Sequence, residues 1–165
     1  MKFRNGEGVN MEKQWNAKVV KSPLSGKTIP LSKVKDKVFS SGVLGDGIAI
    51  EPYTGIAYAP ADGKVTTFFP TGHAIGITTK EGIELLIHIG VDTVRLNGKY
   101  FKPLVKQGDQ LQTGQPMLEF DIEGIKRAGY EITTPVIVTN QDIWKKMGAT
   151  ATQETTVGDA LLWVE

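Results

Sequence analysis

The sequence predicts an all-β protein, an antiparallel β-sandwich with a few short helical turns. Its 165 residues include 19 glycines and 8 prolines, and the apolar runs between them are rich in valine, isoleucine and threonine. Because β-branched runs bounded by turn residues are typical of short strands, strands and turns dominate the predicted fold. The main turn signals are Ser25-Gly26, Gly45-Asp46-Gly47, Asp62-Gly63, Glu81-Gly82, Asn97-Gly98, Gly108-Asp109, Gly114 and Gly158-Asp159.

Helical periodicity is confined to two short segments. The first runs from Ile122 to Ala128. The second runs from Gln141 to Met147, where Asn140 could cap the first turn and Gly148 the last. We therefore expect two short helices in an otherwise β structure.

Two pairs of similar segments favour an internally duplicated β unit. Ser22-Pro-Leu-Ser-Gly-Lys-Thr-Ile resembles Ala59-Pro-Ala-Asp-Gly-Lys-Val-Thr, and Val105-x-x-Gly-Asp-x-Leu resembles Val157-Gly-Asp-Ala-Leu. Spacing alone leaves two interpretations open, because proline and Gly-Asp also recur in the turns of any sandwich. A duplicated unit is the feature of barrel-sandwich hybrid folds. Lipoyl and biotinyl carriers share this pattern, but the sequence lacks their lysine-bearing hairpin tip.

Length and composition exclude several classes of protein. The chain fits one domain, which we place at residues 15–165, after a polar leader or linker remnant at residues 1–14 that we expect to be mobile. A net charge of +1 gives no reason to expect nucleic acid, and the absence of cysteine excludes disulfides, thiol nucleophiles and Cys-ligated zinc. Without a signal peptide or a membrane-length apolar run, we expect a cytoplasmic monomer with no membrane insertion.

The densest chemical signal is a predicted β-hairpin that carries both histidines of the chain, His73 and His88. A two-residue loop at Lys80-Glu81 would place the two histidines directly opposite each other, and a loop at Glu81-Gly82 would make them diagonal neighbours on one face. An odd-length loop without a bulge would separate them. By alternation, the residues that share the outer face with His88 are Glu84 and Leu86, and those that face the core are Leu85, Ile87 and Ile89.

Two adjacent imidazoles are compatible with three kinds of chemistry, or with none. A zinc site needs a third protein ligand, for which Asp92 or Glu84 is the nearby candidate. General acid–base catalysis needs a nucleophile, and no serine or cysteine motif is apparent. A phosphohistidine site would use the imidazole itself, since its ordinary pKa of about 6.5 leaves it neutral at cellular pH. Thr71 could then supply a nearby hydroxyl.

Four motifs together match one protein family. They are Val-Phe-Ser-Ser-Gly-Val-Leu-Gly-Asp-Gly-Ile-Ala-Ile at 38–50, Ala-Pro-Ala-Asp-Gly-Lys-Val at 59–65, Thr71-Gly-His73-Ala-Ile, and Leu-Leu-Ile-His88-Ile-Gly-Val-Asp-Thr-Val. In these motifs the chain resembles the glucose-type enzyme IIA (EIIA) domain of the bacterial phosphoenolpyruvate-dependent sugar phosphotransferase system. The resemblance covers about residues 31–164. It implies an antiparallel β-sandwich, in agreement with the composition, and a phosphotransferase component.

The resemblance also implies roles for four residues. His88 would accept a phosphoryl group from HPr and pass it to a cysteine of the IIB domain of a sugar permease. His73 would stabilise the phosphoryl group and assist its transfer, and Thr71 would support His73. Asp92 would be the acidic neighbour of the phosphohistidine. Sugars of the glucose family are the expected substrates of the permease.

Two partners must reach one histidine and exclude water, so the resemblance implies a shallow apolar docking face. Its members would be Phe39, Val43, Phe69, Leu86 and Val94, and we expect Phe39 and Phe69 to be exposed. No cofactor is required for the transfer, and the accessory expectation is a zinc ion held by His73 and His88 at a partner interface. The alternative functions are a zinc-binding hydrolase and a non-catalytic binding module.

Overall fold

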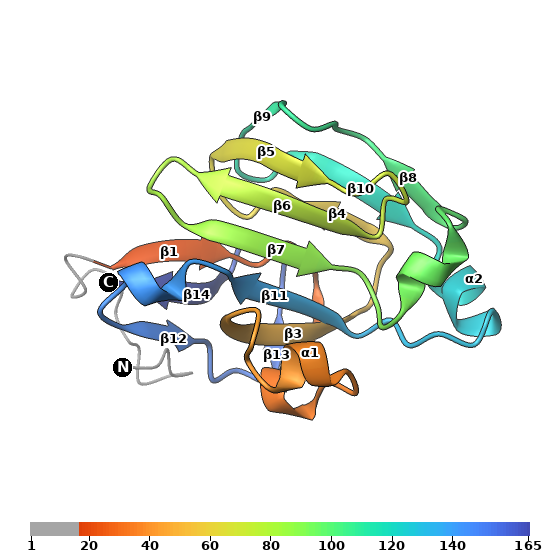
Figure 1. Cartoon of the computed structure of the whole chain (residues 1–165), viewed down its shortest axis with the longest axis horizontal. Helices are drawn as coiled ribbons and strands as arrows, with labels where there is room; N and C mark the ends of the chain where they lie inside the picture. Colours follow the sequence, from red (N-terminus) through yellow and green to blue (C-terminus); the bar gives the residue numbers. More distant parts are fainter. Residues whose placement is uncertain (1–16) are drawn as a thin grey trace.

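A computed structural model describes residues 17–165 and shows antiparallel sheets with little helix (Figure 1). The strands are β1 Lys18–Lys21, β2 Gly26–Pro30, β3 Asp46–Pro52, β4 Ile56–Tyr58, β5 Gly63–Phe68, β6 Ala74–Thr79, β7 Glu84–His88, β8 Phe101–Pro103, β9 Gln110–Leu111, β10 Pro116–Phe120, β11 Thr134–Val138, β12 Met147–Ala149, β13 Glu154–Thr155 and β14 Ala160–Val164. The helices are α1 Lys37–Ser40 and α2 Ile122–Arg127, with 3₁₀ turns at Leu31–Lys33, Thr93–Leu96 and Gln141–Ile143. The predicted fold class is confirmed, and the predicted leader at residues 1–14 lies outside the described residues.

The strands form one large sheet and two small ones. The large sheet has the order β13-β2-β3-β11-β7-β6-β5-β9, and the small sheets have the orders β1-β14-β12 and β4-β10-β8. The main core contains apolar residues from all three sheets, so burying them holds the layers together. Its members include Val65, Ile75, Ile77, Leu85 and Ile87 from the large sheet and Met117, Leu118, Leu161 and Leu162 from the small ones.

The two similar sequence segments occupy equivalent places in the fold. The N–H of Ser22 donates to a carbonyl of Gly158-Asp159 at 2.7 Å, and the carbonyl of Ser22 accepts an N–H of the same pair at 3.1 Å. Ala59 makes the same two bonds with Gly114-Gln115, at 2.8 and 2.9 Å. The structural counterpart of Gly158-Asp159 is therefore Gly114-Gln115, not the predicted Gly108-Asp109.

Each repeat begins a strand at a glycine, Gly26 in β2 and Gly63 in β5. A Cβ at Gly26 would lie 2.1 Å from the carbonyl oxygen of Glu51, and a Cβ at Gly63 would lie 2.3 Å from that of Thr78. The neighbouring strand therefore passes where a side chain would be, which explains why glycine stands at both positions.

One of the two predicted helices is confirmed. α2 begins after Asp121, whose carboxylate accepts the N–H of Gly124 and so caps the first turn. The helix predicted from Gln141 to Met147 is wrong. Only the short 3₁₀ turn Gln141–Ile143 forms, and Met147 begins β12 because Val164 of β14 pairs with it.

The hairpin of β6 and β7 has a three-residue loop at residues 80–82, so both predicted registers are wrong. Ala74 lies opposite His88 and Thr78 opposite Glu84. Gly82 adopts a φ of +89°, the left-handed conformation that three-residue hairpin loops require. Asn140 fixes this end of the hairpin, because its side-chain oxygen accepts the N–H of Glu84 and its amide donates to the carbonyl of Gly82.

Candidate functional site

His73 and His88 lie side by side although the register does not pair them. Their ring centroids are 5.0 Å apart, and the rings are tilted by 78°. His88 is the last residue of β7 and shares its outer face with Leu86, as predicted. His73 precedes β6 in a bend where strand alternation ends, while its carbonyl still accepts the N–H of Ile89 at 2.7 Å. The bend therefore brings the two imidazoles together.

The imidazole of His73 is buried and held by Thr71. Only 2% of His73 is exposed, and its Nδ1 lies 2.5 Å from the hydroxyl oxygen of Thr71. Burial, and after it the positive charge of a protonated His88, lower the pKa of His73 from 6.5 to about 4. His73 is therefore neutral at pH 7.

The tautomer of His88 is set by the backbone. Its Nδ1 lies 2.8 Å from the carbonyl oxygen of Gly90, which can only accept a hydrogen bond. In the neutral ring the proton therefore resides on Nδ1, and Nε2 keeps its lone pair. Burial lowers the pKa of His88, although the Gly90 carbonyl and the carboxylates of Asp36 and Asp92 act in the opposite direction.

Gly90 is required by the shape of this turn. It has a φ of +80°, and a Cβ there would lie 2.6 Å from Cγ2 of Thr93 and 2.7 Å from the carbonyl oxygen of Glu131. The hydroxyl of buried Thr93 donates to the carbonyl of Ile89 and so stabilises the turn between these two residues. The acceptor of the His88 proton is thus held by close packing on two sides.

Two carboxylates accompany His88, and the sequence analysis identified only one of them. Asp92 is exposed at the start of the 3₁₀ turn Thr93–Leu96, with a φ of +59°. Asp36 was missed. It caps α1, accepting the N–H of Val38 at 2.9 Å. An aspartate directly before a short helix is an N-cap signal, and that signal could have located α1.

Phe39 does not lie at the surface, so that expectation is wrong. It is 4% exposed, because α1 turns its ring inward against His88, with the ring centroids 4.9 Å apart. Phe39 belongs to a second core cluster with Leu31, Val34, Ala49, Val91 and Ile137. Its ring therefore supports the imidazole of His88 from inside the protein.

The remaining residues predicted for the docking face are accessible. Phe69 is 42% exposed, as expected, and its ring centroid lies 5.3 Å from that of His73. Val43 and Val94 are exposed and Leu86 is half-buried. The sequence analysis did not include two further exposed apolar residues on and after α1, Val38 and Leu44. A role of these residues in docking stays a prediction.

The histidine pair alone does not make a metal site. Within residues 17–165, the structure contains no group of three or more His, Cys, Asp or Glu side chains that could hold a metal ion. Two imidazoles are fewer than the three protein ligands of a catalytic zinc. The accessory zinc stays a prediction that needs a ligand from a partner protein.

Comparison with known proteins identifies the family. Residues 18–143 match the family model described as phosphoenolpyruvate-dependent sugar phosphotransferase system, EIIA 1. The chain belongs to this family. It is accordingly a phosphotransferase component of that system, and the comparisons give no support to a zinc hydrolase or a binding module.

Sequence relatives of this EIIA domain are longer proteins. It is 52% identical over 143 residues to the β-glucoside-specific EIIBCA component of Halalkalibacterium halodurans, covering 87% of this chain and 22% of that protein. It is 51% identical over 122 residues to the glucose-specific EIICBA component of Staphylococcus carnosus, covering 74% of this chain and 18% of that protein. The chain thus spans about a fifth of the length of these relatives.

A solved structure matches the EIIA domain over almost its full length. The glucose permease IIA from Mycoplasma capricolum is 35% identical, with a TM-score of 0.81, and the match covers 90% of this chain and 96% of that one. In the described part of the chain, helices long and apolar enough to cross a membrane are absent.

Proposed function

We propose that His88 accepts a phosphoryl group on Nε2 and passes it on, so that the EIIA domain works as a phosphohistidine carrier. The observation that carries the proposal is the hydrogen bond from Nδ1 of His88 to the carbonyl of Gly90. It leaves the Nε2 lone pair free on a half-buried, neutral imidazole beside a second neutral imidazole.

In the accepting step, Nε2 of His88 attacks the phosphorus of a phosphohistidine on the donor. A new N–P bond forms, the donor's N–P bond breaks, and the donor imidazole leaves with that electron pair. The donor ring is protonated at its other nitrogen, so it leaves neutral. His88 keeps its proton on Nδ1, where it stays hydrogen-bonded to the Gly90 carbonyl, so no proton has to be transferred within the site.

His73 assists by donating a hydrogen bond. If the Thr71 hydroxyl donates to Nδ1 of His73, the proton of the neutral ring lies on Nε2. That N–H can then donate to an oxygen of the phosphoryl group on His88. Because phosphoryl transfer depends on position and on donors to the equatorial oxygens, a fixed neutral imidazole suits this task.

Asp36 and Asp92 keep the phosphoryl group transferable. Their carboxylates act on His88 through their charge. The same charges repel a phosphoryl dianion on His88, which raises the free energy of the phosphorylated state. The carrier therefore releases the group readily to the next protein.

The partners we propose are HPr as donor and the cysteine of a IIB domain as acceptor, in the cytoplasm. Support comes from the relatives, whose names join IIB, IIC and IIA components in one protein. The sugars in question are glucosides or glucose, the substrates named for those relatives. Exposed Phe69, whose ring lies next to His73, and the exposed side chains of Val43 and Val94 would offer both partners an apolar face.

The test is to incubate the protein with phosphoenolpyruvate, enzyme I and HPr, and then to measure the intact mass and map the acid-labile phosphate. We expect one phosphoryl group on His88 of the wild type and none on His88→Ala. As a matched control, His73→Ala should still accept the group. Full labelling of His88→Ala would place the acceptor elsewhere and overturn the proposal.

A further inference from the structure

Two separate segments hold the imidazole of His88. The Gly90-Val91 turn supplies the carbonyl that binds Nδ1, and α1 supplies the ring of Phe39. In-line transfer to Nε2 requires the His88 ring to keep one orientation. That orientation depends on the turn and α1 keeping fixed positions relative to each other. A contact that joins them would therefore position the nucleophile without touching it.

Glu131 joins the two segments. Its backbone carbonyl accepts the N–H of Val91 at 3.0 Å, and the carbonyl oxygen would lie 2.7 Å from a Cβ at Gly90. Its carboxylate accepts a hydrogen bond from Nζ of Lys35, also at 3.0 Å. Lys35 directly precedes Asp36, the capping residue of α1. One residue thus binds the turn through its backbone and the α1 segment through its side chain.

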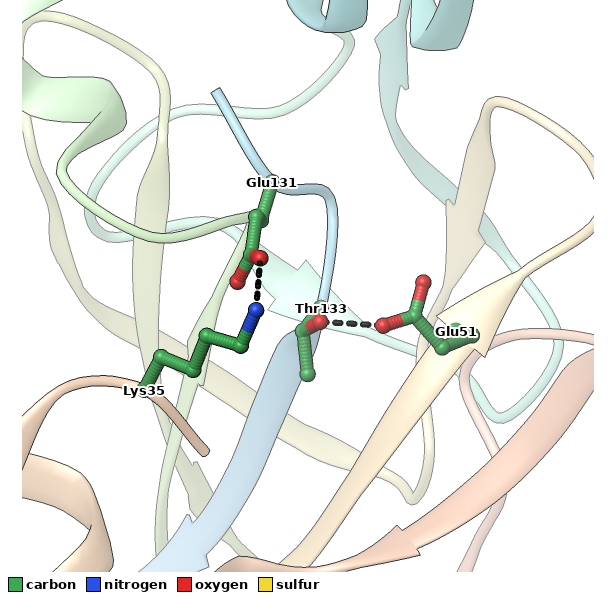
Figure 2. Close-up of polar contacts among 4 residues, drawn as sticks. All are labelled: Lys35, Glu51, Glu131 and Thr133. Atoms are coloured by element: carbon green, nitrogen blue, oxygen red, sulfur yellow. Dashed lines mark hydrogen bonds and ion pairs between the residues drawn. The ribbon is translucent and has the colours of Figure 1, made fainter. Parts of the chain in front are cut away.

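The position of Glu131 is itself fixed. Figure 2 shows the Lys35 side chain reaching Glu131 from the segment before α1, while Thr133, two residues after Glu131, points to Glu51 of β3. The Thr133 hydroxyl donates to the Glu51 carboxylate, and Thr133 is buried. The segment that carries Glu131 is therefore attached to the large sheet, so the carboxylate that binds Lys35 has a fixed position.

We propose that the Lys35–Glu131 ion pair is a positioning pair for His88: it fixes the position of α1 relative to the Gly90-Val91 turn, and so the orientation of the imidazole between them. This inference rests on the proposed phosphohistidine function. Both side chains are partly exposed, at 77% for Lys35 and 46% for Glu131, so solvent screens their attraction. The effect of breaking the pair is correspondingly modest, about two- to fivefold in the rate of phosphoryl acceptance.

The variants that test the pair are Lys35→Gln, Glu131→Gln and the double variant, with Lys35→Arg as the conservative replacement. The matched control is Lys33→Gln, which removes a positive charge from an exposed residue two positions earlier. If only the local charge matters, removing a lysine and removing a glutamate should change the rate in opposite directions. If the pair positions His88, both changes lower the rate, and the double variant loses no more than either single one.

Two measurements are made on the full chain: the initial rate of phosphorylation by phospho-HPr, and the ¹⁵N and ¹H NMR signals of the His88 ring. We expect both Gln variants to slow acceptance and to weaken the Nδ1–H signature of His88, while Lys35→Arg and Lys33→Gln stay at the wild-type values. Thermal unfolding checks that all variants are folded. Opposite rate changes, or unchanged ring signals in both Gln variants, would overturn the proposal.

Failure of the proposed function would look different. If the wild type were not phosphorylated on His88, the proposed carrier mechanism would be refuted. The ring signals of His88 would still show whether Lys35 and Glu131 fix its orientation, so the two outcomes are distinguishable.

Discussion

His88 donates its Nδ1 proton to the carbonyl oxygen of Gly90, only two residues further along the chain, at 2.8 Å. Donor and acceptor belong to the same turn. The protonation pattern of the nucleophile is therefore set by a backbone conformation, and a change in that conformation alters the chemistry of the imidazole.

Replacing Gly90 with alanine tests this dependence. The new Cβ would meet Thr93 and Glu131 at less than 3 Å, in addition to the strain of a positive φ. We expect Gly90→Ala to lose about 1–3 kcal/mol of stability in urea denaturation and to accept phosphate at least tenfold more slowly. Gly129→Ala is the control, because its φ is +95° while no atom of residues 17–165 outside Gly129 and its two chain neighbours lies within 4 Å of the added Cβ. Equal losses in the two variants would refute the packing argument.

Removing the imidazole of His73 should affect the two transfer steps unequally. We expect His73→Ala to slow onward transfer to a IIB cysteine by about 10- to 100-fold, the value of a hydrogen bond to a charged group. Acceptance should suffer less, because the attacking group is then a neutral imidazole, whereas an attacking thiolate adds negative charge to be stabilised. Rapid-quench measurements of both steps decide this. Equal wild-type rates would rule out the role of His73.

The buried His73 should make stability depend on pH. Its folded pKa is about 4 against 6.5 for the ordinary group, so the unfolded chain binds a proton first as the pH falls. The contribution to stability is therefore complete above pH 6.5 and is lost as the pH drops toward 4, by at most about 3 kcal/mol. Urea denaturation at several pH values should show this slope. His73→Gln should show a shallower slope, and an unchanged slope would contradict the assignment.

The two phenylalanines beside the histidines should differ in their contribution to stability. Phe39 is buried in the cluster under His88, and Phe69 is 42% exposed beside His73. We expect Phe39→Ala to cost about 3–5 kcal/mol and Phe69→Ala less than about 1 kcal/mol. Phe69→Ala should instead weaken docking of HPr, measured as a higher KM in the phosphorylation assay. A large loss of stability in Phe69→Ala would show that its exposed ring contributes to the core.

The sequence correctly predicted that the two histidines are adjacent, but the predicted hairpin register is not what brings them together. The strand alternation in β7 is confirmed, because Leu85 and Ile87 are buried and His88 lies on the outer face. The loop length is wrong by one residue in both predicted registers, and a three-residue loop alone would place His73 on the other face. The bend before β6 brings the His73 side chain back next to His88. Hydrophobic periodicity in the sequence cannot predict such a bend.

Two other errors have a common cause. The segment from Gln141 to Met147 has helical spacing, but β14 provides a strand partner for Met147, and that long-range pairing overrides local propensity. Phe39 is expected to be exposed on a docking face, but its ring packs against His88 and the second core cluster. Both outcomes depend on contacts between residues far apart in the chain.

The loop at residues 80–82 offers a place to label the domain at the loss of one partly exposed ion pair, between Glu81 and Lys18. It connects the ends of β6 and β7 that lie opposite to the histidines, one strand length of about 17 Å away. Outside Gly82 and its two chain neighbours, a Cβ at Gly82 would meet no atom of residues 17–165 within 4 Å, and neighbouring Glu81 is exposed. A fluorophore on a cysteine introduced as Glu81→Cys would be the only thiol of the chain. Such a probe could report the approach of each partner while both imidazoles stay accessible.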